Sequence, residues 1–151
     1  MPIYALGDLS PDIHPDAFVH PEAVIIGRVS IGAESTVWPG AVLRGDAEAG
    51  ISVGRRTSIQ DNSVLHTTEE QATTVGDDCV IGHLVHLEGC IIEDGALVGS
   101  GSIVLHHAVV QTGALVGAAA VVPNEMVVPS GAMALGVPAR IRPDSVPAGM
   151  I

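Results

Sequence analysis

Side chains that could bind a metal gather in the middle of the chain. His66 is followed by His83, His86 and Glu88. Residues two apart on a β-strand point to the same side, so His86 and Glu88 would share one face. Imidazole nitrogens and a carboxylate oxygen can bind a divalent metal of the zinc type through three protein ligands and leave one position open. Spacing alone leaves two interpretations, a metal site or solvated side chains on an acidic surface.

The elements that would position these residues are indicated by a period of six. An aliphatic residue returns at every sixth position, and a small residue usually stands four places after it. The aliphatic positions are Ile92, Val98, Val104, Val110, Val116, Val122 and Val128. This period is typical of a parallel β-helix with inward aliphatic side chains and small residues near the corners. The alternative is a β-sandwich whose short strands are evenly spaced.

The same period starts nearer the N-terminus, at Ile26, with Ser30 in the first small position. We expect one all-β domain, a parallel β-helix of about six to seven triangular coils. It would consist of an extended lead-in at 1–23, coils at 24–135 and a tail at 136–151. Residues 67–74 interrupt the period and are expected to leave the coil at a corner. In this register His66 and Glu88 follow inward residues one turn apart, and therefore occupy the same outward column.

Composition narrows the classes of function. The chain has 151 residues, 47% of them hydrophobic and only 2% aromatic, which suits the narrow interior of a β-helix. The formal net charge of -11 disfavours nucleic acid or an anionic membrane as a partner. Cys79 and Cys90 match no metal or redox spacing and are expected to be buried thiols. No signal segment and no apolar run of about 20 residues is present, so we expect a cytoplasmic protein without a membrane span.

Four segments resemble motifs of the γ-class carbonic anhydrase family, and the similarity extends from about Ile13 to Arg142. They are Trp38–Asp46, Ile59–His66, Ile81–His83 and Gly89–Cys90. The resemblance implies the left-handed hand of the β-helix, a homotrimer, and a divalent metal at each subunit interface. Zinc is the expected metal, with iron or cobalt as alternatives. The implied reaction is reversible hydration of carbon dioxide to bicarbonate by a water that the metal makes acidic.

Carried over by position, His66 and His83 match two of the three metal ligands of this family. The family's third ligand is a histidine, and Glu88 stands there in this chain. Glu88 would bind the metal through its carboxylate, or His86 would reach the metal after a shift; we favour Glu88 because it shares the column of His66. A carboxylate ligand makes the metal less electrophilic, so weak or redirected activity is expected.

The remaining site predictions also come from the resemblance. Arg44 and Asp61 resemble the family's interface ion pair, and Asp46 resembles a carboxylate that organises this pair. Gln60 corresponds to a residue that hydrogen-bonds the metal-bound water. Glu69 corresponds to a proton-shuttling glutamate in one branch of the family.

Two other functions are open at this stage. A coenzyme A-dependent acyltransferase is supported by the segment Gly136–Ala139, which resembles the closing segment of many such enzymes. A metal-binding scaffold without catalysis would follow from the glutamate at position 88. His106 and His107 lie on a later coil and are expected at the surface rather than in a second metal site.

Overall fold

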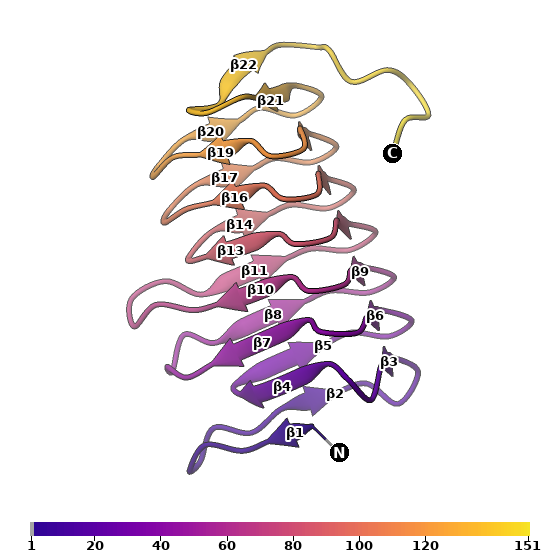
Figure 1. The fold of residues 1–151 in the computed structure, drawn as a ribbon, viewed down its shortest axis with the longest axis vertical. Coiled ribbons are helices and arrows are strands. Elements are labelled where there is room, and N and C mark those ends of the chain that lie inside the picture. The colour runs from indigo at the N-terminus through magenta and orange to yellow at the C-terminus, as the bar shows by residue number, and fades with distance from the viewer. Residues whose placement is uncertain (1) are drawn as a thin grey trace.

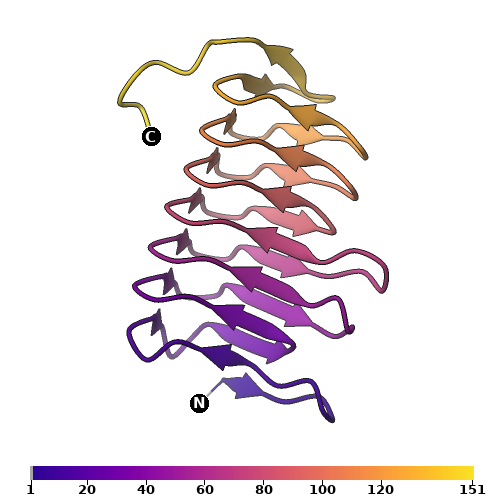
Figure 2. The same ribbon diagram turned by 180° about the vertical axis from the view of Figure 1, so that it is seen from behind.

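The chain folds as a left-handed parallel β-helix, as predicted (Figure 1). The structure is a computed structural model that describes residues 2–151. Short strands climb in about seven stacked turns of triangular section, and the view from behind shows the same stacking (Figure 2). In the described part of the chain, no helix is long and apolar enough to cross a membrane.

Three sheets form the faces of the triangular coil. The first sheet consists of β1 (Ile3–Tyr4), β4 (Val24–Gly27), β7 (Val42–Gly45), β10 (Val64–His66), β13 (His86–Glu88), β16 (Ile103–Val104) and β19 (Val121–Val122). The second consists of β2 (Asp12–Ile13), β5 (Val29–Ile31), β8 (Ile51–Val53), β11 (Thr73–Val75), β14 (Ile91–Ile92), β17 (Val109–Val110) and β20 (Val127–Val128). The third consists of β3 (Phe18–Val19), β6 (Thr36–Val37), β9 (Ser58–Ile59), β12 (Val80–Ile81), β15 (Leu97–Val98), β18 (Leu115–Val116), β21 (Met133–Leu135) and β22 (Arg140–Arg142).

The interior confirms the period of six. All seven aliphatic positions from Ile92 to Val128 are completely buried. Of the small residues four places after them, Ala96, Ser102 and Ala108 are also completely buried, whereas Met126 is only partly buried against the core. Each turn therefore buries its aliphatic side chains between the turns before and after it, which is why isolated turns would not be stable.

The predicted start of the period was wrong by one residue. Ile25, not Ile26, points inward, and its Cα pairs with that of the buried Leu43. Val29 is likewise buried at the position predicted for Ser30, which is exposed. Two adjacent isoleucines satisfy a hydrophobic pattern equally well, and a shift of one residue exchanges the two faces of a strand. From Ile25 to Leu43 the buried residues then follow one another at a regular spacing of six.

Both ends of the chain pair with the coil. In residues 2–23, the strands β1, β2 and β3 pair in parallel with β4, β5 and β6 of the next turn. After the last turn, β22 folds back antiparallel on β21 and covers the upper edge of the third sheet (Figure 1). An exposed sheet edge is thereby paired within the chain.

Candidate metal centre

The first sheet brings three polar side chains into one outward column. On β10, His66 lies in register with Arg44 of β7 on one side and with Glu88 of β13 on the other. Leu65 and Leu87, the residues before His66 and Glu88, are completely buried. Alternation along the strand then directs His66 and Glu88 outward. The predicted column of His66 and Glu88 is confirmed.

A chain of hydrogen bonds runs along this column. His66 Nε2 lies 2.8 Å from Asp46 Oδ1, and His66 Nδ1 lies 2.8 Å from Glu88 Oε1. The other carboxylate oxygen, Glu88 Oε2, lies 2.8 Å from His106 Nε2. Arg44 extends the chain at its other end, where a guanidinium nitrogen lies 3.6 Å from Asp46 Oδ2.

Two carboxylates meet the imidazole of His66, one at each ring nitrogen. A carboxylate can only accept hydrogen bonds, and a neutral imidazole has one N–H to donate. His66 faces carboxylates at both ring nitrogens. The hydrogen bonds from His106 and then from His66 also lower the pKa of Glu88 below its ordinary value, which keeps this carboxylate ionised.

Buried hydroxyl groups tie the strands of the column together. Thr73, which is completely buried, donates its hydroxyl to the carbonyl of His66 and accepts the amide N–H of Gly89 at 2.8 Å. Ser63, also completely buried, donates to the carbonyl of Gly82 at 2.7 Å and accepts the amide N–H of Val85. The backbone beside each candidate ligand is therefore held by an interaction inside the coil.

His83 lies apart from this column. It stands on the corner before β13, where its Nδ1 lies 3.2 Å from Asp61 Oδ1. Glu88 is the last residue of β13, so the strand runs between it and this corner. The step from His86 to Glu88 along the strand already covers about 6.6 Å, so His83 is farther from Glu88 than that. His86 points to the same side as Glu88, with its Nε2 3.9 Å from Glu88 Oε1.

Within one subunit, the predicted ligands do not close around a single point. Among the described residues, no three His, Cys, Asp or Glu side chains are placed to hold a metal ion. No ion pair joins Arg44 to Asp61 in residues 2–151; Arg44 contacts Asp46, and Asp61 contacts His83. Gln60 is half-buried beside Asp61 at the same corner, away from the column of His66.

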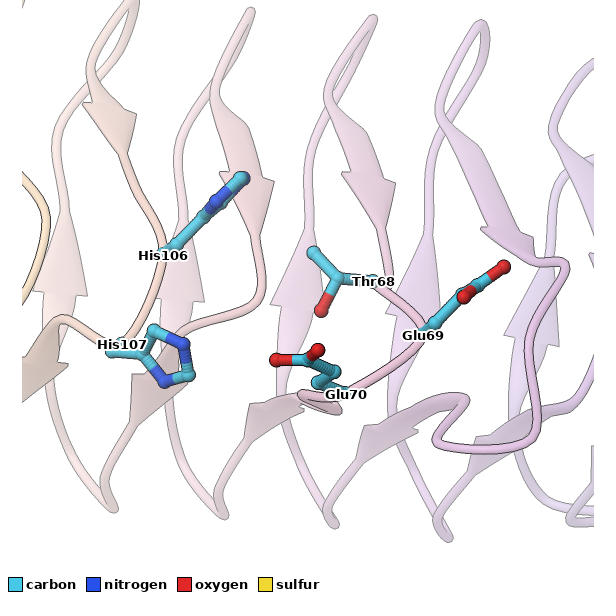
Figure 3. Close-up of a pocket in the computed structure, with 5 residues that line it drawn as sticks. All are labelled: Thr68, Glu69, Glu70, His106 and His107. Atoms are coloured by element: carbon cyan, nitrogen blue, oxygen red, sulfur yellow. The ribbon is translucent and has the colours of Figure 1, made fainter.

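Two cavities flank the loop formed by residues 67–72. One, of about 360 Å³, is lined by Asp46, Ala47, His66, Thr67, Thr68 and Glu69. The other, of about 270 Å³, is lined by Thr68, Glu69, Glu70, His106 and His107. Figure 3 shows Thr68 and Glu70 directed toward the two histidines, whereas Glu69 points to the opposite side of the loop. Glu69 lines both cavities, and it lies next to His66 in the larger one.

His106 belongs to this site, although it was predicted only as a surface residue. Its side chain is partly exposed, as expected, but it is hydrogen-bonded to Glu88. The signal that could have found it is its distance in sequence, because His106 follows Glu88 by 18 residues, the length of one regular turn. His107 has an exposed side chain.

Comparisons with known proteins decide the family. Residues 10–45 and 72–106 match the family model described as Bacterial transferase hexapeptide (six repeats). The mitochondrial gamma carbonic anhydrase 2 of Arabidopsis thaliana is 43% identical over 104 residues, which cover 65% of this chain and 37% of that protein. The carbonic anhydrase of Geobacillus kaustophilus is 44% identical over 139 residues, covering 92% of this chain and 76% of that protein. The chain belongs to the γ-class carbonic anhydrase family.

A comparison with solved structures agrees with this family. A hexapeptide transferase family protein from Anaplasma phagocytophilum has a solved structure with a TM-score of 0.88 and 38% identity, covering 93% of this chain and 82% of that chain. This chain spans less than two fifths of the length of the Arabidopsis protein.

Relatives named as γ-class carbonic anhydrases imply a metal cofactor, so its fit to this chain can be tested. The donor types fit, since His66 offers an imidazole and Glu88 a carboxylate. The two carboxylates facing one imidazole also provide the negative charge that a cation needs. Within residues 2–151 of one subunit, too few of these donors converge on one point to hold the ion.

Proposed function

We propose that this protein catalyses the reversible hydration of carbon dioxide at a metal shared between subunits of a homotrimer. The observation that carries the proposal is the column of His66 and Glu88, whose side chains are hydrogen-bonded at 2.8 Å. The relatives of this chain include proteins named as carbonic anhydrases. His66 and Glu88 would hold the metal together with His83 of the partner subunit. We propose zinc as the metal, which supplies a Lewis acid that lowers the pKa of a bound water.

The position of His83 supports a shared site. His83 and Glu88 lie at opposite ends of the stretch that contains β13, and therefore on opposite sides of the face that the first sheet forms. In a three-fold assembly with parallel coil axes, one side of this face can lie against the opposite side of the same face in the neighbouring subunit. This geometry would place His83 of the partner subunit beside the His66 column, while His83 in its own subunit stays remote.

An apolar stripe on the first sheet supports the trimer. The outward residues next to the His66 column are in register from turn to turn: Val24, Val42, Val64, His86, Ile103 and Val121. Val64 in this stripe is 39% exposed. The corresponding column of the second sheet is polar in its earlier turns, at Ser30 and Ser52. A stripe beside the site that is apolar except at His86 is the surface that we expect a second copy to cover.

Other polar residues near the proposed metal would orient a ligand, carry a proton or bind a water. Asp46 accepts a hydrogen bond at His66 Nε2 and thereby fixes the orientation of the ring. Glu69 borders both cavities, so its carboxylate can carry a proton between the larger cavity and solvent. Gln60 and Asp61 stand on the corner of His83 and would enter the site with it, where the Gln60 amide can hydrogen-bond a water.

Metal content tests the proposal first. Protein purified without added metal is analysed for elements, as wild type and as the variants His66→Ala and His14→Ala. His14 lies in the lead-in, far from the column, and serves as the control. About one metal ion per subunit in the wild type and in the His14 variant, lost in the His66 variant, is expected. Carbon dioxide hydration is then followed with a pH indicator in a stopped-flow instrument, and activity that survives complete metal removal would refute the mechanism.

A second candidate is coenzyme A-dependent acyl transfer. It is favoured by the match of residues 10–45 and 72–106 to a bacterial transferase family model. In such a mechanism a histidine would act as general base toward an acceptor hydroxyl or amine, without a metal. Acetyl-CoA should then raise the melting temperature of the metal-free protein, because a ligand that binds only the folded state stabilises it. Metal uptake without any turnover would instead leave a metal-binding scaffold.

A further inference from the structure

The carboxylate of Glu88 is held at both oxygens by histidines from different turns. Oε1 lies 2.8 Å from His66 Nδ1, and Oε2 lies 2.8 Å from His106 Nε2. The third nearby imidazole, that of His86, is 3.9 Å from Oε1, which is too long for a hydrogen bond. The orientation of the carboxylate is therefore fixed by one histidine from the turn before it, His66, and one from the turn after it, His106.

We propose that His106 is the positioning residue for Glu88: it donates its Nε2–H to Oε2 and so directs Oε1 toward the metal position beside His66. This inference rests on the proposed function. A glutamate has one more rotatable bond than a histidine, so a glutamate at a ligand position loses more conformational freedom when it is fixed. An outer hydrogen bond to the ligating group offsets this cost by holding the group in place before the metal binds.

The backbone of His106 is itself fixed to the strand of Glu88. The amide of His107 donates to the carbonyl of Gly89 at 2.7 Å, and the amide of Leu105 donates to the carbonyl of Val122. The corner that carries His106 is thereby joined to the residue directly after Glu88. His107 follows in a left-handed conformation, with φ of 62°, and its ring lies on the side of Glu70 (Figure 3).

Three variants separate positioning from a general structural effect. His106→Ala removes the donor, His106→Gln keeps an N–H donor of similar reach, and His107→Ala changes the neighbouring histidine as a control. The dissociation constant of Zn²⁺ is measured on metal-stripped protein by competition with a chelator. We expect His106→Ala to weaken zinc binding by about 10–100-fold. His106→Gln should recover most of this loss, and His107→Ala should leave the constant unchanged, with similar melting temperatures for all metal-free proteins.

Three results of this measurement would overturn the proposal. Unchanged zinc affinity in His106→Ala would show that the hydrogen bond has no role. A glutamine variant as weak as the alanine variant would exclude positioning by an N–H donor. Complete loss of zinc in His106→Ala, equal to that in His66→Ala, would make His106 a ligand instead.

A metal-free measurement keeps the inference separate from the proposed function. If the wild type takes up no zinc, the proposed function fails, and the contact is then tested by nitrogen-15 NMR of the histidine rings. Because His66 and His106 share the carboxylate of Glu88, the His66 ring signals should shift in His106→Ala and stay in place in His107→Ala. Unchanged His66 signals in His106→Ala would refute the positioning role.

Discussion

Thr73→Val should destabilise the coil strongly although it preserves the shape of the side chain. The Thr73 hydroxyl is completely buried, donates to the carbonyl of His66 and accepts the amide N–H of Gly89. Valine leaves the buried amide of Gly89 without this partner, at a cost of about 1–3 kcal/mol, and removes one further hydrogen bond worth about 1 kcal/mol. The expected loss in the free energy of unfolding is roughly 3 kcal/mol. For a chain of this size, this corresponds to a fall in Tm of roughly 6–12 °C.

The neighbouring residue supplies the control. Thr74 is half-buried on the outward side of the same strand, and its hydroxyl makes no hydrogen bond to any residue in 2–151. Thr74→Val should change the stability by less than about 0.5 kcal/mol. Unfolding is followed by circular dichroism in urea and on heating, at one protein concentration, because subunit association also stabilises the folded chain. Equal stabilities of the two variants would refute the assignment of these two buried hydrogen bonds to the Thr73 hydroxyl.

Three further predictions test the interior and the corners. Burial raises the pKa of the Cys90 thiol to about 12, and Cys79 is also buried, so neither should react with a disulfide reagent at pH 8 until the chain is unfolded, when both should react. Ile92→Ala should lower the free energy of unfolding by about 2–5 kcal/mol, measured in urea. Ala119 has a φ of 59°, so Ala119→Gly should stabilise the protein by about 0.5–1 kcal/mol on the same assay, whereas Ala118→Gly should destabilise it; equal signs would contradict the backbone assignment.

The fold could be predicted because the interior of a β-helix repeats the same constraint at every turn. An inward position accepts an aliphatic residue and rejects a charge, so the period of six from Ile92 to Val128 is readable without a structure. Where two hydrophobic residues are adjacent in the sequence, the pattern does not show which of them points inward. The pair Ile25 and Ile26 was resolved only by the register with Leu43 and Arg44, which places Ile26 in the outward column.

The candidate site was predictable where strand alternation controls direction. Leu65 and Leu87 point inward, so His66 and Glu88 must point outward in one column. The contact between His106 and Glu88 could not be derived in this way, because His106 lies on a corner after β16. Side-chain direction at a corner depends on the local backbone, as in the left-handed conformation of His107. The pairing of His83 with Asp61, at another corner, was missed for the same reason.

The two contacts of Glu88 imply that restoring the family's histidine at this position requires two changes. Glu88→His would remove the carboxylate that His66 and His106 share as an acceptor. The new imidazole at position 88 would then face the imidazole of His106 with no carboxylate between them. Residues in one hydrogen-bonded network respond non-additively to substitution. Combining Glu88→His with His106→Asp returns an acceptor to the outer nitrogen of the new histidine. We expect the double variant to bind zinc about 10-fold or more tightly than Glu88→His alone. Equal zinc affinities in the chelator assay would mean that His106 and residue 88 act independently.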